Sequence, residues 1–487
     1  MGASRNIGVS IESQGTAWDH VRVWRIAGRE AISELFSWDV DVFCDAEHDL
    51  PDGTGVGERV TLVITHDGDE VRRIHGAIGA VRKSFGAFDD HLAYRLRVVP
   101  RAAALGAVET QEIFLGKTVP EIIQSKLERH DLTGADVDLR LLGTYPKREF
   151  VVQYKETDAA FVSRLAEQAG ISFFFEHDGD SERLVITDQP SGFRVPEGAA
   201  GTLAFQARGE SSGAYELERV EGPVPTSYIE QDYNYRSPLV DLSGVYDLET
   251  GTGGGVVEFG AHVKTPEEAQ ALAKVRAEER RADQLYYEGK AGSLTLSAGQ
   301  RVTLADVPGG DGDLVVVASI ETTAVIPLMN QSLPAGTPPS WSSSFRLVPA
   351  SFTYRPRRRT PKPVAPAAVT GVIQPGAEGE TGGVAQLDAD GRYLVQFHFD
   401  TAAPGQAKAS HRIRLAQPFS GAGYGMHFPL RRGTEVLVAF TNGDLDRPVI
   451  VGALYNAASP SPVVAQNANT HQITTSSGIS LEFGAGS

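Results

Sequence analysis

The chain has 487 residues, a mass of 52.2 kDa and a formal net charge of −17 at pH 7. This acidic balance argues against non-specific binding to nucleic acid or to an anionic membrane, because both need a basic protein face. A single cysteine, Cys44, excludes an intrachain disulfide. No apolar run of about 18 residues occurs, and Met1–Ser10 lacks the apolar stretch of a cleaved secretory signal. We therefore expect neither a transmembrane helix nor a signal peptide.

Most of the N-terminal part of the chain consists of short runs that are rich in Val, Ile, Leu and aromatic residues. Polar residues alternate through several of these runs, and Gly, Pro or Asp clusters bound them, which is typical of strands. The clearest runs are His20–Ile26, Arg59–Thr65, Leu92–Val99, Arg183–Thr187, Ser293–Leu296 and Asp313–Ser319. This pattern predicts a mainly β fold.

Helices are few but have clear start and stop signals. Thr118-Val-Pro-Glu121 is a capping box with a proline in the first turn, and Thr265-Pro-Glu-Glu268 repeats it before a helix that runs to about Asp283. Between them, Thr157–Ala169 has helical apolar spacing and stops at Gly170, a typical C-terminal cap. A few helices among many strands indicate antiparallel β-domains with helical connectors rather than βαβ units.

A proline-basic linker occupies residues 354–366. We expect its cluster Arg355–Arg359 to anchor the linker against an acidic neighbouring domain, in preference to binding phosphate. Five strand-like runs follow, and together they predict a small closed barrel of the OB type. These runs are Ala368–Ile373, Arg392–Phe399, His411–Ala416, Glu435–Thr441 and Pro448–Leu454, with turn signals at Asp390-Gly391 and Asn442-Gly443.

Catalytic signals are weak. Gly209-Glu-Ser211-Ser-Gly213 matches the nucleophile-elbow pattern of serine hydrolases, which needs a strand that turns sharply into a helix. The match lies between two strand-like runs instead, so a flexible turn is the better interpretation and a hydrolase using Ser211 is the less favoured alternative. The histidines show no metal-ligand spacing, and Asp388-Ala-Asp390-Gly391 lacks the other ligands of a calcium loop. We predict no catalytic residue, no cofactor and no metal site.

An OB-type barrel also raises the possibility of a single-strand nucleic-acid binder, which needs a basic groove and exposed aromatic residues. Residues 361–456 hold eight Lys/Arg and eight Asp/Glu, so the barrel is electrically balanced. Tyr393, Val395, Phe397 and Phe399 share one face of their strand, and we expect them to fill the barrel core. The sequence therefore predicts no nucleic-acid partner.

The barrel region resembles a known family. The segment from Pro429 to Asn456 resembles the barrel signature of VgrG, the spike protein of type VI secretion systems. Upstream segments are similar to the family's other barrel strands and its hub motif. These segments are Glu30–Phe36, Ile74–Gly76, Tyr94–Pro100, Val151–Asp158, Gly391–Phe397, Arg412–Pro418 and Gly423–Met426. The hub and tail-spike proteins of contractile-tailed phages and of other contractile injection systems share the same two-part architecture.

The resemblance implies a non-enzymatic hub and spike of a contractile injection machine. Three copies would form a homotrimer on a hexameric, Hcp-like tube protein, next to baseplate proteins. The spike would pierce a target membrane with only transient contact and would carry effector cargo, with a PAAR-type tip protein at its end. It would stay cytoplasmic until firing and then be secreted or delivered. The rival within this class is the spike of an extracellular contractile injection particle or a phage-like tail.

The resemblance also implies a domain order. Residues 1–353 would form the hub, with two tandem β-barrels and connecting helices, and 354–366 the linker. Residues 367–457 would form the OB-fold neck, and 458–487 the start of a C-terminal β-helix or a truncated tail. The structural motif of the OB domain would comprise Pro429, Gly433, Glu435, Gly443, Asp444, Asp446, Arg447, Pro448, Gly452 and Asn456. In this motif Gly433 and Gly443 would permit turns, Pro448 would begin a strand, and Asp446 and Arg447 would form a local ion pair.

Overall fold

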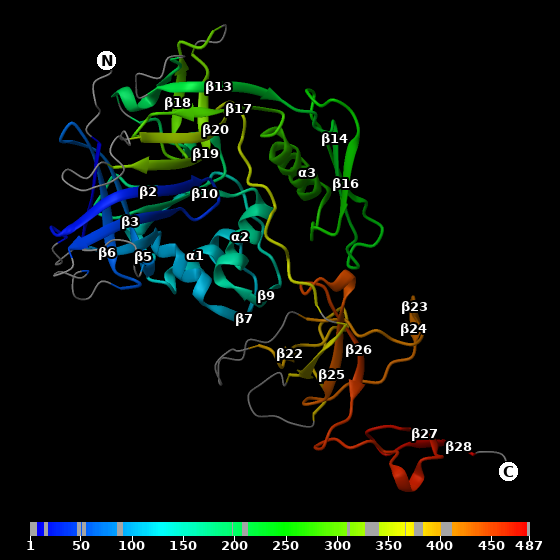
Figure 1. Cartoon of the computed structure of the whole chain (residues 1–487). Helices are drawn as coiled ribbons and strands as arrows, with labels where there is room; N and C mark the ends of the chain where they lie inside the picture. Colours follow the sequence, from blue (N-terminus) through cyan, green and yellow to red (C-terminus); the bar gives the residue numbers. More distant parts are fainter. Residues whose placement is uncertain are drawn as a thin grey trace. The chain divides into compact units, whose positions relative to one another are not determined.

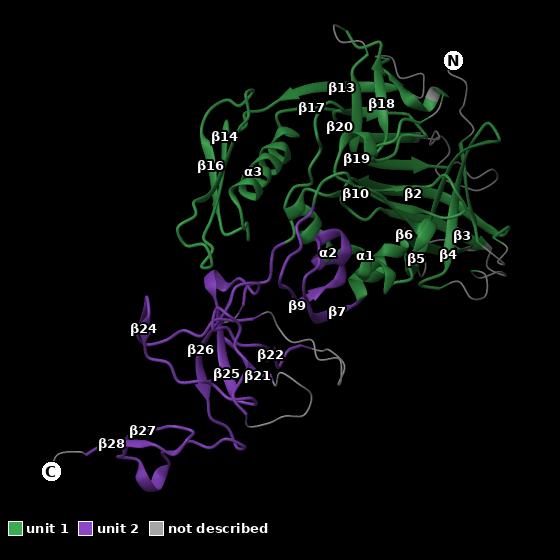
Figure 2. Cartoon of the chain, turned by 180° about the vertical axis from the view of Figure 1, so that it is seen from behind, with its two compact units in different colours: residues 1–107, 123–144, 162–360 green, residues 108–122, 145–161, 361–487 purple. Residues whose placement is uncertain are grey.

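The computed structural model describes residues 7–13, 18–45, 50, 55–84, 91–196, 198–206, 213–308, 312–326, 340–365, 367–374, 383–400 and 412–484. The chain runs from an N-terminal set of strands to a C-terminal hairpin (Figure 1). Contacts group it into two compact units that are interleaved in sequence (Figure 2). Unit 1 comprises residues 1–107, 123–144 and 162–360, and unit 2 comprises 108–122, 145–161 and 361–487.

Unit 1 is built on a twelve-stranded sheet, counted over the described residues. Its N-terminal half has the order β1-β4-β5-β6-β3-β2. The bounds are β1 Ile7–Glu12, β2 Val21–Ala31, β3 Ser37–Asp45, β4 Arg59–His66, β5 Asp69–Ser84 and β6 His91–Val99. The order continues as β19-β20-β17-β13, with β12 and β18 branching from β19. These strands are β12 Thr202–Ala204, β13 Ala214–Glu221, β17 Leu285–Ala291, β18 Arg301–Ala305, β19 Leu314–Val325 and β20 Ser340–Pro349.

The two halves form one continuous sheet because β2 pairs antiparallel with β19. Both strands alternate between buried and exposed residues, as expected of strands with one face on a core. Gly28 in β2 is needed for this packing, since a Cβ at this position would lie 2.2 Å from the fully buried ring of Trp38. The predicted mainly β fold is therefore confirmed, with the tandem β-assemblies of unit 1 joined edge to edge.

The predicted helices are confirmed, and their caps form as expected. They are α1 Val119–Glu128, α2 Asp158–Ala169 and α3 Pro266–Arg281. The Glu121 carboxylate accepts a hydrogen bond from the Thr118 backbone N–H at 2.7 Å, and the Thr265 hydroxyl accepts one from the Glu268 N–H at 3.2 Å. Gly170 ends α2 with a φ of 71°, a left-handed conformation that glycine adopts without strain. No helix of the described residues is both long and apolar enough to cross a membrane.

Smaller sheets lie in the part of the chain between residues 109 and 259. α3 packs against a three-stranded sheet of order β15-β14-β16 (Figure 1). Its strands are β14 Ser227–Asp232, β15 Leu242–Asp247 and β16 Gly255–Phe259. Gly244 permits this approach, because a Cβ there would lie 2.1 Å from the Gln270 backbone nitrogen. The other strands in this part are β7 Glu109–Phe114, β8 Val137–Arg140, β9 Val151–Thr157, β10 Ser172–Glu176 and β11 Arg183–Thr187, of which β7 pairs with β9.

Unit 2 contains the predicted five-run barrel. Its strands have the order β22-β21-β25-β26, with β21 Val369–Ile373, β22 Val395–Phe397, β25 Glu435–Phe440 and β26 Pro448–Leu454. The fifth run closes the barrel through two bridges, Tyr393 to Ile413 and Leu415 to Ile450. Two hairpins lie outside this sheet, β23 Ser420–Gly421 with β24 Tyr424–Gly425 and β27 His471–Thr474 with β28 Ser480–Phe483.

Three of the expected strands differ from the structure. The run Arg392–Phe399 is shortened to β22 with an isolated bridge at Tyr393. The prediction of a strand at Ser293–Leu296 is wrong. Side-chain donors occupy backbone carbonyls of this segment that would otherwise accept from a neighbouring strand. The Ser293 carbonyl accepts from the Trp341 indole at 2.9 Å, and the Thr295 carbonyl accepts from the Gln300 amide. The expected strand His411–Ala416 is reduced to the two isolated bridges, and His411 itself lies outside the described residues.

Two histidines make unit 1 sensitive to acid. The His75 backbone N–H donates to Nδ1 of His177 at 3.1 Å, and Phe36 packs edge-on against the His177 ring. Burial lowers the pKa of His177 well below its usual value, and the positive charge of Arg72 lowers it further. The unfolded chain binds a proton near pH 6.5 that the folded chain does not, so stability is full above that pH and lost as the pH falls.

We predict that the free energy of unfolding drops by on the order of 1 kcal/mol between pH 7 and pH 5.5 on account of this site. His177→Asn keeps an acceptor for the His75 N–H but does not titrate, so its stability should fall less over the same range. Thermal unfolding of both proteins at the two pH values measures the difference. Equal acid sensitivity of the variant and the parent would contradict the assignment.

Candidate functional site: a buried junction in unit 2

The turn between β25 and β26 has the backbone that its sequence predicts. Asn442 and Gly443 have φ values of 57° and 72°. The Gly443 carbonyl accepts a hydrogen bond from the Ala365 N–H at 2.8 Å. A Cβ on Gly443 would lie 2.6 Å from Cγ1 of Val364, so glycine is required both for its φ and for this close approach. The turn thereby docks the end of the linker region on the barrel.

A lysine and two aspartates form the polar centre of this turn. Lys362 Nζ donates to Oδ1 of Asp444 and, at 2.7 Å, to Oδ2 of Asp446. The other Asp446 oxygen, Oδ1, accepts the backbone N–H of Val152 in β9 at 2.8 Å. The Asp446 side chain is only 3% exposed, and a carboxylate so buried is tolerated when a cation and hydrogen bonds satisfy it. We call Lys362, Asp444, Asp446 and Val152 the OB junction.

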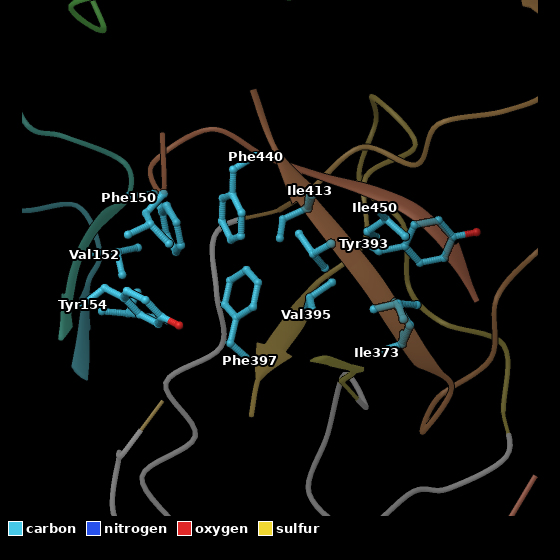
Figure 3. Packing of buried hydrophobic residues seen from close by; sticks show 14 of the residues in the cluster. Phe150, Val152, Tyr154, Ile373, Tyr393, Val395, Phe397, Ile413, Phe440 and Ile450 are labelled. Carbon is cyan, nitrogen blue, oxygen red and sulfur yellow. The ribbon is translucent and has the colours of Figure 1, made fainter. Parts of the chain in front are cut away.

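The antiparallel pair of β7 and β9 contributes side chains to the same hydrophobic cluster as the barrel (Figure 3). Phe150, Val152 and Tyr154 point from the β9 segment toward Phe397 and its neighbours. The ring centroids of Phe150 and Phe397 are 6.2 Å apart. The buried members are Ile113, Phe150, Val152, Tyr154, Ile373, Ala385, Tyr393, Val395, Phe397, Ile413, Val436, Val438, Phe440, Leu445 and Ile450. The barrel core therefore includes residues of a segment that lies more than 200 residues earlier in the chain.

The aromatic residues of the run Arg392–Phe399 lie inside the barrel, as the sequence predicts. Tyr393, Val395 and Phe397 are fully buried, and Phe399 is partly buried against them. The rings of Phe397 and Phe399 stack with centroids 4.9 Å apart. Because these rings are enclosed, they are not available as a platform on which nucleic-acid bases could stack.

The remaining motif residues fall into separate places. Glu435 begins β25, and its carboxylate accepts the Asn456 amide at 2.8 Å. Gly433, with a φ of 81°, forms the turn before β25, and Pro429 lies exposed upstream of it. Pro448 begins β26, and Gly452 lies within it. Arg447 adjoins the OB junction through its backbone, since its N–H donates to the Asp444 carbonyl at 2.8 Å, and its ion pair with Asp446 stays a prediction.

The basic linker is anchored in unit 1 by acidic residues, which confirms the sequence interpretation. Arg355 Nε donates to Glu278 at 2.8 Å, and its Nη1 donates to the carbonyls of Gly170 and Asp188. Arg358 is paired with two glutamates, and Arg357 and Arg359 with one acidic residue each. These pairs are Arg358 with Glu258 and Glu279, Arg357 with Asp283, and Arg359 with Glu34. The linker lines a hollow of about 960 Å³ whose walls carry seven basic and seven acidic residues, so no net charge selects a ligand there.

The other candidate positions are a residue outside the described part of the chain, a closed turn and a buried cysteine. Ser211, the residue of the hydrolase alternative, lies outside the described residues. At the partial calcium-loop pattern, the Asp388 carboxylate accepts the Asp390 and Arg392 N–H groups and pairs with the Arg392 guanidinium. This is a turn closed by its own arginine, as the hairpin interpretation expects. Cys44 is buried in β3.

Sequence reasoning missed Lys362 and Val152 as parts of the junction. Lys362 was one basic residue of a linker, and Val152 one apolar residue of the segment that resembles the hub motif. No local pattern could join them, because Val152 and Asp446 are 294 positions apart. The available signal was the pair of aspartates Asp444 and Asp446, because two adjacent carboxylates need a cation. The basic residue next to them in the sequence is Arg447, and nothing in the local sequence pointed to Lys362 instead.

We predict that Lys362→Met destabilises unit 2 by about 2 kcal/mol, because it leaves the buried Asp446 carboxylate without its cation. The double variant Lys362→Met with Asp446→Asn should recover part of this loss, since the amide is neutral and keeps an acceptor for the Val152 N–H. Hydrogen exchange of β25 and β26 in the full chain measures the effect. Lys274→Met, on the exposed side of α3, is the matched control, and equal protection in it and in Lys362→Met would contradict the junction.

Comparison with known proteins identifies the family to which the chain belongs. The sequence model of the phage tail baseplate hub (GPD) family matches residues 29–326, and that of the type VI secretion system/phage-baseplate injector OB domain matches residues 381–455. The chain is 29% identical to the type VI secretion system spike protein VgrG4b of Pseudomonas aeruginosa over 467 residues. This match covers 91% of the chain but 55% of that relative, so the chain spans about half the relative's length.

Solved structures have the same fold. The Escherichia coli c3393 protein, described as a type VI secretion component similar to the T4 tail proteins gp27 and gp5, matches with a TM-score of 0.65 at 22% identity. The match covers 92% of this chain and 99% of that one. A chain of the Francisella PdpA–VgrG complex matches with a TM-score of 0.62 at 9% identity, covering 97% of this chain and 74% of that one. The chain belongs to the phage tail baseplate hub family, carries an injector OB domain after the hub, and has VgrG spike proteins among its relatives.

Proposed function

We propose that this chain is the hub and neck of the spike of a contractile injection machine, most closely of the type VI kind. In this role it is a structural protein without catalytic chemistry. The observation that carries the proposal is the order of the two family matches, hub at residues 29–326 and injector OB domain at 381–455, in one chain. The ten motif residues of the OB domain then act by holding turns and strands in place.

The proposed active form is a homotrimer, and the C-terminal hairpin supports it. Ile473 of β27 pairs with Leu481 of β28, and His471 pairs with Phe483. Since side chains alternate along strands, these four lie on one face of the hairpin, with Gln472 opposite. Ile473, Leu481 and Phe483 are all exposed in the single chain. A two-stranded hairpin is marginal in water, and three copies could bury these faces against one another as the start of a β-helix.

The remaining parts of the proposal follow from the family resemblance. The trimer would sit on a hexameric, Hcp-like tube and beside baseplate proteins, and would carry effectors and a PAAR-type tip protein. It would remain cytoplasmic until the sheath contracts, and would then be driven through a target membrane and delivered outside the cell. The domain order of hub 1–353, linker 354–366, neck 367–457 and tail 458–487 belongs to the same proposal. The neighbouring genes distinguish it from an extracellular particle or phage-like tail, since a membrane complex and a tube-recycling ATPase accompany type VI systems.

We predict a solution mass near three times 52.2 kDa by light scattering. Leu481→Asp should shift the mass toward one chain, because it places a charge in the shared apolar face. Gln472→Asp is the matched control: it puts the same charge on the opposite face of the hairpin and should leave the mass unchanged. A single-chain mass for the parent protein would contradict a trimer specified by these residues.

The injection role itself predicts binding to the tube. Native mass spectrometry of the chain mixed with the tube protein of the same organism should give three chains on one hexameric ring. Leu481→Asp should weaken this complex, because a single hub cannot match the ring's symmetry. Failure of the trimeric parent protein to bind any ring would contradict the proposed place in the machine.

A further inference from the structure

Glu230 of β14 is a buried carboxylate without a hydrogen-bond partner. It points to the face of the sheet that α3 covers and is 1% exposed, and neither of its oxygens accepts a hydrogen bond. The nearest cationic atom is Arg276 Nε, 3.5 Å from Oε1. Arg276 directs its Nη2 elsewhere, to the Gln168 carbonyl at 2.9 Å. An ionised carboxylate in such a place is costly, because burial disfavours the charged form unless donors replace water.

Three further charged residues surround this pair within unit 1. Glu279 of α3 lies 3.4 Å from Arg276 Nη1, and Glu258 of β16 lies 3.9 Å from Arg276 Nε. The linker contributes Arg358, whose Nε donates to Glu279 at 3.1 Å and whose Nη atoms donate to both Glu258 oxygens. We call Glu230, Glu258, Glu279, Arg276 and Arg358 the buried charge cluster. Through it, the sheet, α3 and the linker meet at one set of ionisable groups.

The buried charge cluster contains one more carboxylate than guanidinium groups. Glu258 and Glu279 balance Arg276 and Arg358, and they hold every described hydrogen bond in the cluster that joins a carboxylate to a guanidinium. β15 contributes no compensating charge, since Gly244 is the residue that pairs with Glu230. The Tyr228 hydroxyl, two residues away on the same face of β14, is also without a described hydrogen bond. Nothing on these elements donates to Glu230.

We propose that Glu230 is a proton-binding site, and that the proton it binds sets how firmly the buried charge cluster holds α3 and the linker. With the proton bound, the cluster has two carboxylates for two guanidinium groups. When the proton leaves, the third carboxylate repels Glu258 and competes for Arg276. Solvation of that charge requires water to enter between α3 and the sheet, which loosens both α3 and Arg358.

The direction of the pH dependence follows from this arrangement. Burial raises the pKa of Glu230 to about 7, and the neighbouring Glu258 carboxylate adds to the shift. The folded chain thus holds a proton that the unfolded chain releases near pH 4.5, so this site contributes stability at mildly acidic pH that is lost as the pH rises through 7. The effect is opposite in sign to that of His177. The inference does not depend on the injection role.

Glu230→Gln tests the proposal, since the amide has the same shape but cannot ionise. At pH 5.5 we expect the opening equilibrium of residues 224–281 to be about tenfold smaller in the variant than in the parent, because the opened parent chain has already released the Glu230 proton. At pH 8.5 the difference should grow to roughly a few hundredfold, because the closed parent chain has then lost the proton as well. Hydrogen exchange of the full chain, corrected for the intrinsic pH dependence, measures this equilibrium. A variant that opens more than the parent at pH 8.5 would show that Glu230 is ionised and paired, and would overturn the proposal.

Glu258→Gln is the matched control. Arg358 holds the pKa of the Glu258 carboxyl below its usual value, so this residue stays ionised across the tested range. Its amide variant removes a partner of Arg358 and should increase opening at pH 5.5, where Glu230 is neutral and the cluster is balanced. If Glu258→Gln instead tightened the region at pH 5.5, the cluster would already hold an excess carboxylate, and the proton would not reside on Glu230. Should either variant fail to fold, exchange of the parent chain remains decisive: protection of α3 and of residues 354–360 that does not fall between pH 5.5 and pH 8.5 would refute the proposal.

Discussion

The apolar cluster of unit 2 is the constraint on which the organisation of this protein depends. A small five-run barrel encloses few residues, and here Phe150, Val152 and Tyr154 of a distant segment complete its core. The OB junction makes that packing specific, since the Asp446 carboxylate reaches the Val152 N–H and Lys362 neutralises it. Apolar burial supplies most of the cohesion, and the buried ionic contact fixes the register of β9 against the barrel turn.

The basic linker follows the same principle in unit 1. In a chain of net charge −17, a run of arginines finds carboxylates readily, and Arg355, Arg358 and Arg359 each pair with at least one. The planar guanidinium groups of Arg355 and Arg358 form three described hydrogen bonds each, which orders a proline-rich segment that has no helix or strand of its own. Charge complementarity therefore holds the linker in place, whereas apolar packing holds the barrel together.

Local patterns in the sequence were sufficient for elements whose causes are local. Capping boxes at Thr118 and Thr265 predicted two helix starts, and alternation in Tyr393–Phe399 predicted which side chains are buried. The strand prediction at Ser293–Leu296 was wrong because two side chains from outside the segment donate to its backbone carbonyls. These side chains are Trp341 and Gln300, and no local pattern predicts their contacts. The OB junction and the buried charge cluster were beyond reach for the same reason. Each joins residues from three or more segments, and no spacing rule records such a meeting.

The interleaving of the two units has a consequence for biosynthesis. Both strands of the β7–β9 pair leave the ribosome long before Asp446, which is 294 residues further along than Val152. Until the barrel segment is made, Val152 and Tyr154 lack the cluster that buries them, so the nascent hub carries an exposed apolar edge. The chain therefore cannot complete unit 2 as a late, independent module. Recombination that exchanges OB domains between such chains would need to move the β7–β9 pair together with the barrel.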